Sequence, residues 1–504
     1  MNLATYLENS AARSPEKTAI RFEGEQISYK DLNSDCNRLA NGLSELGIKP
    51  GDRCLVMMPN SIDIVRSYYA LAKLGAVAIP VNFLFRQHEL TYIVSDAKPK
   101  AFIGSSDYLE EISKVLDAAE GGPEILITAG TSHSDRFREL KDIYSAVETF
   151  STHEAEADDL LAIIYTSGTT GVPKGVMLTQ NNLISNSTTI SEIRGDIEPD
   201  TVVLGVLPLF HIFGINSVLN SSMYMGLTFQ LFPHFDPEKV VEVIEKENRT
   251  ILFAVPTMYN RLIGVVEGKP PKKNSLKFCV SGGASMPVEI LKQFTDLFGA
   301  TIYEGYGLTE APVCVENPFG QETRVGSIGF PIPHFSARII DESGNEVATN
   351  EVGELTVKGP GVTKGYLNLE EATARTIQDG WLHTGDMARM DDDGFYYIVD
   401  RKKDMIIRGG YNIYPREIEE LLYQIPDVVE TAVYGVPHED LGEEIAAVVV
   451  LKANSTMDSE SIKAFVKERV APYKYPRIVR IVSEALPKSG SGKILKKEIR
   501  TMYV

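Results

Sequence analysis

The sequence contains little cysteine, a single tryptophan and no long hydrophobic run, and these shortages exclude several classes of protein. Its 4 cysteines among 504 residues are scattered without the spacing of a metal site. We therefore expect Cys36 and Cys279 to be buried, reduced thiols, which fits a cytoplasmic protein. No stretch reaches the roughly 18 apolar residues of a membrane-spanning helix, so no transmembrane segment is expected. The first residues lack the basic and apolar regions of a signal peptide.

Positive charge is also scarce. The chain has 69 acidic against 50 basic residues, which gives a formal net charge of −19. Such a surface repels nucleic acids and anionic membranes, so we expect no nucleic-acid partner and no membrane held by bulk electrostatics. Peripheral contact with a membrane and a local basic pocket for an anionic ligand both stay open.

The chain is too long for one hydrophobic core, so at least two domains are expected. Helical and strand patterns alternate along most of its length, which is typical of parallel sheets with helices on both faces. The expected helices and strands are residues 29–43, 54–58, 60–74, 76–80, 202–207, 239–247, 251–255 and 277–281. Two later strands, 338–341 and 353–357, indicate a smaller antiparallel unit.

The pattern changes near residue 400, and about a hundred residues follow, which is the size of a small domain. We predict an α/β fold in two domains. Residues 1–402 form a large N-terminal domain of two doubly wound sheets plus a small antiparallel β unit. Residues 403–504 form a small mobile α+β C-terminal domain, whose basic last helix is expected to begin at Lys493.

A polar, glycine-rich stretch follows an apolar run that is typical of a buried strand. Residues 166–175 read Thr-Ser-Gly-Thr-Thr-Gly-Val-Pro-Lys-Gly. Glycines let the backbone approach an anion, while hydroxyls, backbone N–H groups and Lys174 supply donors for phosphate oxygens. A solvated surface loop would explain the composition, but not the lysine and proline among the glycines. The Walker A pattern does not fit, because Pro173 stands five residues after Gly168, where that pattern requires glycine.

Residue for residue, this stretch resembles the phosphate loop of the adenylate-forming superfamily, which includes acyl-CoA synthetases, luciferases and the adenylation domains of peptide synthetases. Four more motifs are similar to motifs of that family and stand in its order, at residues 282–284, 304–310, 383–386 and 487–493. Residues 304–310 and 404–412 most resemble medium- and long-chain fatty acyl-CoA synthetases. The resemblance covers nearly the whole chain. It implies a ligase that activates a carboxylic acid with ATP and Mg²⁺ and passes the acyl group to CoA.

The resemblance also implies a nucleotide site. Lys174 would stabilise the β- and γ-phosphates, Tyr306 would stack on adenine, and Glu310 would hold Mg²⁺. Asp386 would accept both ribose hydroxyls, and Arg401 would be a second ribose contact or, alternatively, part of a structural salt bridge. The residues expected to bind ATP or AMP are Thr166, Ser167, Gly168, Thr169, Thr170, Gly171, Lys174, Gly282, Gly283, Ala284, Glu304, Gly305, Tyr306, Gly307, Asp386 and Arg401.

Three residues are implied in catalysis and one in domain motion. Lys493 would bridge the substrate carboxylate and the α-phosphate, where a cation stabilises two anions brought together. Thr309 would contact the α-phosphate, and His211 would gate the carboxylate end of the acyl pocket. Lys403 would be the hinge about which the small domain rotates between two half-reactions. The plainer alternatives are a basic helix face for Lys493, a satisfied core residue for His211 and a solvated lysine for Lys403.

Val255, Met258 and Gly305 are implied as the lining of the acyl pocket. Malonate-activating relatives carry an arginine at the position of Gly305, so glycine here favours an uncharged, apolar acid. A medium- or long-chain fatty acid is the first expectation. An aromatic acid such as a benzoate or cinnamate stays open, because pocket depth depends on packing.

The acceptor of the acyl group is less well defined. Gly409 and Gly410 would face CoA in the second half-reaction. A tryptophan that stacks on the adenine of CoA in some relatives corresponds to Leu441, so a carrier protein on a separate chain stays open as the acceptor, as does a homodimer. A catalytically dead protein of the same fold is the alternative from another class, and the presence of Asp386 and Lys493 argues against it. Nothing in the sequence specifically supports luciferase-type oxidation.

Overall fold

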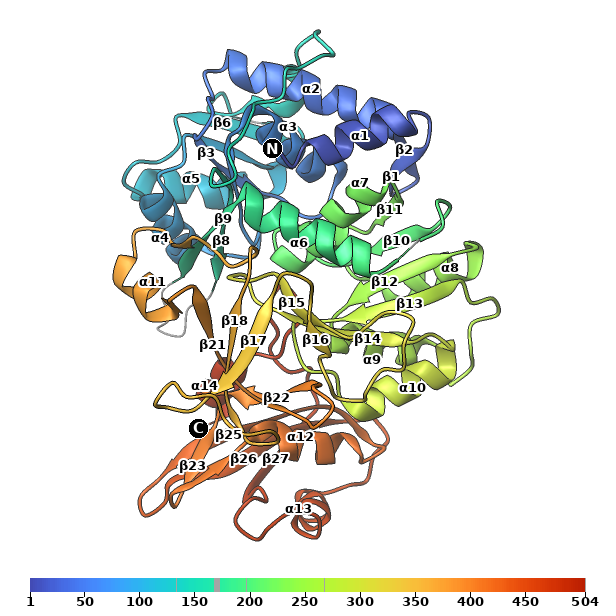
Figure 1. Ribbon diagram of the computed structural model, residues 1–504, viewed down its shortest axis with the longest axis vertical. Coiled ribbons are helices and arrows are strands. Elements are labelled where there is room, and N and C mark those ends of the chain that lie inside the picture. The colour runs from blue at the N-terminus through green and yellow to red at the C-terminus, as the bar shows by residue number, and fades with distance from the viewer. Residues whose placement is uncertain (133, 167–172, 196, 267, 504) are drawn as a thin grey trace.

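The computed structural model describes residues 1–132, 134–166, 173–195, 197–266 and 268–503. A large N-terminal body and a smaller C-terminal body lie one after the other along the long axis (Figure 1). Within the described residues, three β-sheets belong to the first body and one to the second. This architecture confirms the predicted fold class.

The first sheet is a mostly parallel sheet in the order β19-β9-β8-β4-β3-β5-β6-β7. Its strands are β3 (Arg53–Met57), β4 (Val77–Pro80), β5 (Ala101–Ser105), β6 (Ile125–Ala129), β7 (Arg138–Glu139), β8 (Leu160–Thr166), β9 (Lys174–Thr179) and β19 (Gly365–Tyr366). The helices of this region are α1 (Thr5–Arg13), α2 (Tyr29–Glu45), α3 (Ile62–Leu74), α4 (Gln87–Ala97) and α5 (Leu109–Ala118), with short 3-10 turns η1 (Ser106–Tyr108) and η2 (Leu140–Asp142). Cys54 and Val56 of β3 pack into a cluster that includes α2 and α3, whereas Leu55 and Met57 pack into one that includes α4 and α5. Because both faces are covered, the strands read as continuous apolar runs.

The second sheet has the order β16-β15-β14-β13-β12-β10-β11-β1-β2 and carries most of the predicted site. Its strands are β1 (Thr18–Phe22), β2 (Glu25–Ser28), β10 (Val202–Gly205), β11 (Thr228–Leu231), β12 (Thr250–Ala254), β13 (Leu276–Ser281), β14 (Ile302–Gly307), β15 (Val313–Glu316) and β16 (Phe330–Pro331). The associated helices are α6 (Gln180–Ile193), α7 (Ser221–Met225), α8 (Pro237–Lys246), α9 (Pro256–Val265) and α10 (Val288–Phe298). Strands β10 to β14 run parallel, whereas β14 and β15 form an antiparallel pair. The predicted strands 202–207, 251–255 and 277–281 are confirmed within two residues.

A wide π-helical segment, η3 (Phe213–Asn220), follows His211 and continues into α7. The sequence pattern predicted no helix here, because the segment contains glycine, serine and two asparagines, which are poor helix formers. The two asparagines bond to each other, since Asn220 Nδ2 donates to Asn216 Oδ1 at 3.1 Å. Tertiary contacts therefore override the local propensity, and π-helical turns of this kind are frequent at functional sites.

The predicted smaller antiparallel unit is confirmed as a five-stranded sheet that lies beside the C-terminal body (Figure 1). It contains β17 (Ser336–Ile340), β18 (Gly353–Lys358), β20 (Ile377–Gln378), β21 (Trp381–Met390) and β22 (Tyr396–Arg401), and helix α11 (Glu370–Thr376) precedes β20. Residues 402–404 form a turn that leads from β22 into the C-terminal body. The domain boundary after residue 402 stays a prediction.

The C-terminal body has its own sheet in the order β24-β23-β26-β25, with β27 parallel to β26. Its elements are β23 (Ile406–Arg408), β24 (Tyr411–Ile413), α12 (Pro415–Tyr423), β25 (Val428–His438), β26 (Gly442–Leu451), α13 (Ser459–Lys467), β27 (Ile478–Val482) and α14 (Lys496–Tyr503). The expectation that the last helix begins at Lys493 is wrong: α14 begins at Lys496. Lys493 lies instead in a short hairpin closed by a β-bridge between Lys488 and Ile494, because a Gly-Ser-Gly run disfavours helix.

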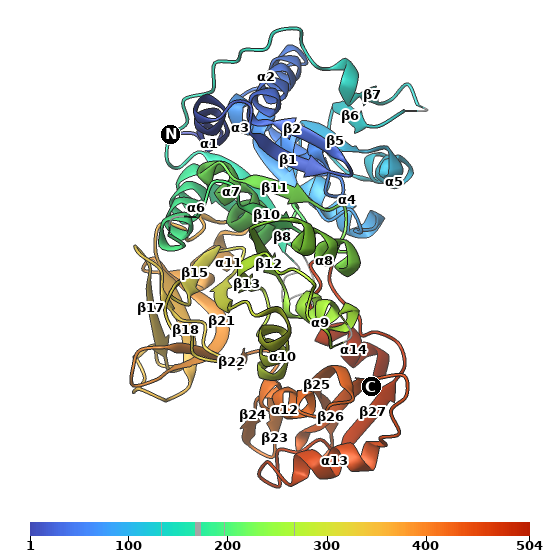
Figure 2. The same ribbon diagram turned by 90° about the vertical axis from the view of Figure 1, so that its right-hand side faces the viewer.

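Hydrogen bonds join the two bodies at β22, where the Arg416 N–H donates to Asp400 Oδ2 at 2.8 Å, and on the side that carries α9 and α10 (Figure 2). Asn260 Nδ2 donates to Val429 O at 2.9 Å, and Thr257 Oγ1 donates to Gly492 O at 3.0 Å. The backbone N–H of Val288 donates to Glu420 Oε2 at 3.1 Å. The C-terminal body thus rests on α9 and on the start of α10, with the Lys493 hairpin inserted beside α9.

The cysteines and the helices agree with two expectations drawn from the composition. Cys36 and Cys279 are free and buried, as predicted, and so are Cys54 and Cys314. Burial raises the pKa of Cys36 to about 12, so this thiol stays protonated. Among the described residues, no helix combines the length and the apolar character needed to cross a bilayer.

Candidate active site

The predicted phosphate loop joins two antiparallel strands. Thr166 at the end of β8 lies directly opposite Lys174 at the start of β9. The loop is therefore part of a hairpin, whereas a Walker A loop runs from a strand into a helix. Ser167, Gly168, Thr169, Thr170 and Gly171 lie outside the described residues, so their predicted contacts with phosphate stay predictions.

Tyr366 of β19 links the lysine of this loop to the predicted metal-binding carboxylate. The Lys174 ammonium lies over the Tyr366 ring, 4.6 Å from its centroid. The Tyr366 hydroxyl donates to Glu310 Oε1 at 2.8 Å. Sequence reasoning missed Tyr366, because only the pairing of β19 with β9 brings this residue to the loop.

Glu310 is suited to a magnesium ion that arrives with a nucleotide. In the described part of the chain no cluster of three His, Cys, Asp or Glu side chains exists that would hold a metal by itself. Mg²⁺ is usually held by one or two carboxylates together with substrate phosphates and water. A single carboxylate, oriented by Tyr366 beside the phosphate loop, fits that arrangement.

The two residues predicted to contact the ribose, Asp386 and Arg401, lie side by side. Asp386 of β21 and Arg401 of β22 are cross-strand neighbours, and Arg401 Nε lies 3.6 Å from Asp386 Oδ1. The Tyr306 hydroxyl donates to Asp386 Oδ2 at 2.6 Å. Burial raises the pKa of Asp386, while Arg401 and the Tyr306 hydrogen bond lower it. Burial and Asp386 also raise the pKa of Tyr306, so its hydroxyl stays protonated and remains the donor.

Lys493 lies in its hairpin opposite Ser489, and the hairpin brings its side chain to Gly283 of the large body. The Ser489 N–H donates to Lys493 O at 2.8 Å, and the Lys493 N–H donates to Ser489 Oγ at 3.2 Å. The side chain lies against Gly283, whose φ is +81° and where a β-carbon would come within 3.1 Å of Lys493 Cε. Any other residue at Gly283 would strain the backbone and displace the lysine.

Both positively and negatively charged side chains act on Lys493. Burial is the largest influence and lowers the pKa of Lys493 to about 8, with Arg401 acting in the same direction. Asp386 and Glu310 oppose this change by favouring the charged form. The lysine is therefore mostly protonated at pH 7, and it lies in the field of the predicted ribose and magnesium ligands.

His211 stands just before η3 and is uncharged at physiological pH. Its Nδ1 accepts a hydrogen bond from the Phe213 N–H at 3.2 Å. Burial lowers the pKa of His211 to about 3, and Lys493 contributes to the change. This histidine is therefore a neutral, partly buried ring near Lys493, and its role as a gate stays a prediction.

The glycines after β13 form a narrow wall next to Gly305. A β-carbon on Gly282 would lie 3.2 Å from the Phe213 ring and 3.4 Å from Gly305 O. A β-carbon on Gly283 would lie 3.6 Å from Val255 Cγ1. Val255 thus contacts this wall, as a pocket-lining residue would. Met258 is buried on the first turn of α9, and Ala284 is exposed beyond the wall.

The other predicted residues of the 304–310 motif lie in different surroundings. Gly307 ends β14, and Thr309 is buried in the turn that leads to β15. The Glu304 carboxylate accepts from the Met286 N–H at 3.3 Å. Burial raises the pKa of Glu304 to about 7, and Arg416 of the C-terminal body opposes that shift. The structure therefore places the Glu304 carboxylate toward the C-terminal body, while the Tyr306 hydroxyl bonds to Asp386.

The predicted hinge and CoA residues lie on exposed turns. Lys403 is exposed in the turn that follows β22, beside the end of the large body. Gly409 and Gly410 have φ values of +57° and +83° in the turn between β23 and β24. The Gly409 N–H donates to Leu441 O at 2.8 Å, and Gly410 borders open space.

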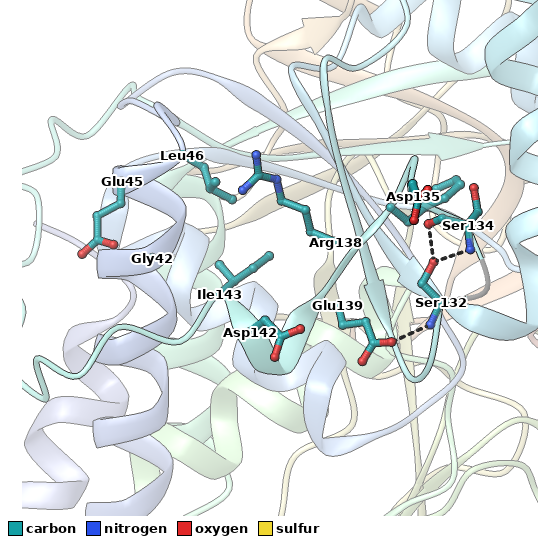
Figure 3. Close-up of a pocket in the computed structure, with 11 residues that line it drawn as sticks. Gly42, Glu45, Leu46, Ser132, Ser134, Asp135, Arg138, Glu139, Asp142 and Ile143 are labelled. Carbon is teal, nitrogen blue, oxygen red and sulfur yellow. Dashed lines mark hydrogen bonds between the residues drawn. The ribbon is translucent and has the colours of Figure 1, made fainter.

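A separate surface pocket lies between α2 and a segment that contributes Ser132 and residues 134–143 (Figure 3). Acidic side chains and Arg138 line it, and Glu139 Oε1 accepts from the Ser132 N–H at 2.9 Å. None of the predicted site residues lines this pocket. It is therefore not part of the candidate active site.

Comparison with known proteins identifies the family. The AMP-binding enzyme family model matches residues 7–367, and the model of the AMP-binding enzyme C-terminal domain matches residues 417–493. The long-chain-fatty-acid–CoA ligase of Bacillus subtilis (strain 168) is 39% identical over 527 residues, covering 99% of this chain and 94% of the relative. The feruloyl-CoA synthase of an Amycolatopsis species is 36% identical, with 99% of each protein covered. The crystal structure of ATP-bound MatB from Rhodopseudomonas palustris superposes with a TM-score of 0.91 at 33% identity, covering 100% of this chain and 99% of that one. The chain therefore belongs to the AMP-binding enzyme family, within the adenylate-forming superfamily, and is similar to acyl- and aryl-CoA ligases.

Proposed function

We propose that the protein is an AMP-forming acid–CoA ligase. It joins a carboxylic acid to ATP as an acyl-adenylate, releases pyrophosphate, and then transfers the acyl group to the thiol of CoA with release of AMP. The observation that carries this proposal is the position of Lys493. Its side chain lies against Gly283, and the negative charges of Asp386 and Glu310 favour its protonated form. One cation thus stands among groups suited to bind a sugar, a phosphate chain and a carboxylate.

In the first half-reaction, a carboxylate oxygen of the acid attacks the α-phosphorus, and the bond to pyrophosphate breaks. Lys493 stabilises the negative charge that gathers where the carboxylate meets the phosphate. Asp386 holds the ribose, and Tyr306 and Lys174 position the adenine and the outer phosphates. Glu310 would hold Mg²⁺, which supplies charge neutralisation for the phosphates.

In the second half-reaction, the C-terminal body rotates about Lys403 and withdraws Lys493. The turn at Gly409 and Gly410 then faces the acyl-adenylate, and the thiol attacks the acyl carbon with loss of AMP. Such a rotation would break the hydrogen bonds that Thr257, Asn260, Val288 and Arg416 make between the bodies.

The pH dependence of adenylation tests the role of Lys493. Only the protonated amine stabilises the anions, so kcat/KM for acid-dependent pyrophosphate exchange is expected to fall as the pH rises through about 8. The pKa of His211 is about 3 and that of Glu304 about 7, so neither group causes a fall in activity through pH 8. Lys493→Arg keeps its charge at high pH and should remove the alkaline fall. An unchanged alkaline limb in that variant would assign it to another group.

For the acid itself, we propose a medium- or long-chain fatty acid first. The similarity to the Bacillus subtilis long-chain-fatty-acid–CoA ligase supports this choice, as does the absence of an arginine at Gly305. An aromatic acid is the second candidate, favoured by the feruloyl-CoA synthase relative. Loading of a carrier protein, homodimer formation and a cytoplasmic location stay predictions.

The function is tested by measuring AMP formation from ATP and Mg²⁺ over a panel of carboxylic acids, each with and without CoA. AMP turnover that requires both an acid and CoA is the expected result. Pyrophosphate exchange to which CoA adds nothing would indicate a carrier protein as the acceptor. No acid-dependent reaction with any member of the panel would contradict the proposal.

A further inference from the structure

The hairpin that carries Lys493 is closed by contacts within its own backbone. It runs from Pro487 to Leu495, whose N–H donates to Pro487 O at 2.9 Å. A β-bridge joins Lys488 to Ile494 one step further in. These contacts fix the shape of the hairpin. Its place on the C-terminal body is fixed by contacts outside this stem.

The start of the hairpin is tied to strand β25 by an ion pair. The Lys488 ammonium donates to Glu430 Oε1 of β25. The other oxygen of the same carboxylate, Glu430 Oε2, accepts from the Leu486 N–H at 3.0 Å. The Leu486 side chain is buried. One glutamate therefore holds two residues at the point where the chain enters the hairpin.

The end of the hairpin is tied down in the same way. Lys496 begins α14, directly after Leu495, and its Nζ lies 2.8 Å from Glu419 Oε1 of α12. This oxygen also accepts from the Val433 N–H of β25 at 2.7 Å. Burial opposes the charge of Lys496, but Glu419 and Asp400 outweigh burial and raise the pKa of the lysine, so it stays charged. Both ends of the hairpin are thus held by lysine–glutamate pairs, which we call the hairpin clamp: Lys488–Glu430 and Lys496–Glu419.

Helix α12, which carries one glutamate of the hairpin clamp, also contacts the large body. The Arg416 N–H at its first turn donates to Asp400 Oδ2 of β22 at 2.8 Å. Glu420 Oε2, further along the helix, accepts from the Val288 N–H of α10 at 3.1 Å. The hairpin is therefore connected to the large body through α12 as well as through its own contact, in which Thr257 Oγ1 donates to Gly492 O at 3.0 Å.

The position of the Lys493 amine leaves little room for error. Its side chain lies against Gly283, where a β-carbon would come within 3.1 Å of Lys493 Cε. A misplacement of about 1 Å in a reacting geometry can cost about 100-fold in rate, even when the change that causes it lies far from the chemistry. A hairpin that holds a charge-stabilising amine therefore needs firm support at both ends.

We propose that Glu419 and Glu430 are positioning residues for adenylation, which act through Lys496 and Lys488 to hold the hairpin where Lys493 meets the predicted nucleotide ligands. This inference rests on the proposed ligase function and adds to it residues that touch neither the acid nor the nucleotide. All four residues of the hairpin clamp belong to the C-terminal body. They would therefore move together with the hairpin in the proposed rotation, and they serve the half-reaction that uses Lys493.

Lys496→Met tests the proposal, because it breaks one ion pair and keeps a long side chain. Acid-dependent pyrophosphate exchange is expected to fall at least about tenfold, since a displaced amine stabilises less of the developing charge. Thioester formation from added acyl-adenylate should keep most of its rate. Lys496→Arg restores a cation opposite Glu419 and should recover most of the exchange rate. Lys488→Met repeats the test at the other pair, and thermal unfolding confirms that each variant is folded.

Two results overturn the proposal. One is a wild-type exchange rate in both folded variants, Lys496→Met and Lys488→Met. The other is an equal loss of both half-reactions, which would assign the hairpin clamp to the stability of the C-terminal body. If the wild-type protein shows no acid-dependent exchange with any carboxylic acid, the ligase function itself is wrong.

The pH profile of exchange separates displacement of Lys493 from lost stability. Burial and Arg401 lower the pKa of Lys493 to about 8, whereas Asp386 and Glu310 oppose them. In Lys496→Met the alkaline fall in kcat/KM is expected at higher pH, because a less buried lysine returns toward its ordinary pKa of about 10.4. A fall that stays at about pH 8, with the rate reduced, contradicts the proposed displacement.

Lys474→Met is the matched control. Lys474 pairs with Glu417 of the same helix at 2.7 Å and its side chain is 24% exposed, against 2.8 Å and 22% for Lys496. It lies between α13 and β27, outside the hairpin. Exchange rate and pH profile should both stay at the wild-type values in this variant. Similar losses in Lys474→Met and Lys496→Met would reflect the removal of any positive charge from the C-terminal body and would overturn the assignment.

Discussion

Replacing Lys493 with alanine is expected to lower acid-dependent pyrophosphate exchange by about 100- to 1000-fold, the usual effect of removing one preorganised group that stabilises transition-state charge. The structure holds this amine in a hairpin beside Gly283, with burial lowering its pKa to about 8. Thioester formation from added acyl-adenylate should keep most of its rate, because the proposed rotation withdraws Lys493 before that step. Radiolabelled pyrophosphate exchange and a thioester assay measure the two steps separately.

Lys497→Ala is the matched control for this experiment. Lys497 is exposed on α14, four residues further along the same basic segment. If Lys493 acted only as one of several positive charges on a basic helix face, the two substitutions would have similar effects. Equal loss of both half-reactions in Lys493→Ala would contradict a role confined to adenylation and would indicate a structural role for the hairpin.

Asp386→Asn is expected to weaken ATP binding, with an increase in the KM for ATP of about 10- to 150-fold. The carboxylate can accept from two ribose hydroxyls, whereas an amide offers one acceptor oxygen and an NH₂ group that cannot accept. Asparagine keeps an oxygen for the Tyr306 hydroxyl, which lies 2.6 Å from Asp386 Oδ2, so local packing should be preserved. Steady-state kinetics with varied ATP, together with thermal unfolding, measure the two effects.

Asp392→Asn provides the control, because Asp392 is exposed in the turn that connects β21 to β22. It changes the same charge on the same hairpin without touching Tyr306 or Arg401. A normal KM for ATP in Asp386→Asn would assign the Asp386–Arg401 contact to structure alone. A fall in kcat with an unchanged KM would instead place its effect in the transition state.

The family and the fold class followed from the sequence alone, and so did the prediction of a candidate site, because these depend on short stretches whose local order carries the chemistry. Glycines and hydroxyls after a strand predict an anion-binding loop, and alternating helical and strand patterns predict doubly wound sheets. The position of Lys493 after a Gly-Ser-Gly run also distinguished it from neighbouring lysines. Its place in a hairpin, with α14 beginning only at Lys496, did not follow from propensity.

Which distant residues share a site depends on the packing of the whole chain. Tyr366 joins Lys174 to Glu310 through the pairing of β19 with β9, and no local motif marks it. Arg194 and Glu316 belong to none of the recognised motifs, yet they form an ion pair in which both side chains are fully buried. Burial likewise sets the pKa values of Lys493 and His211. Desolvation and long-range contacts depend on the packing of the whole chain, which a local pattern of residues does not contain.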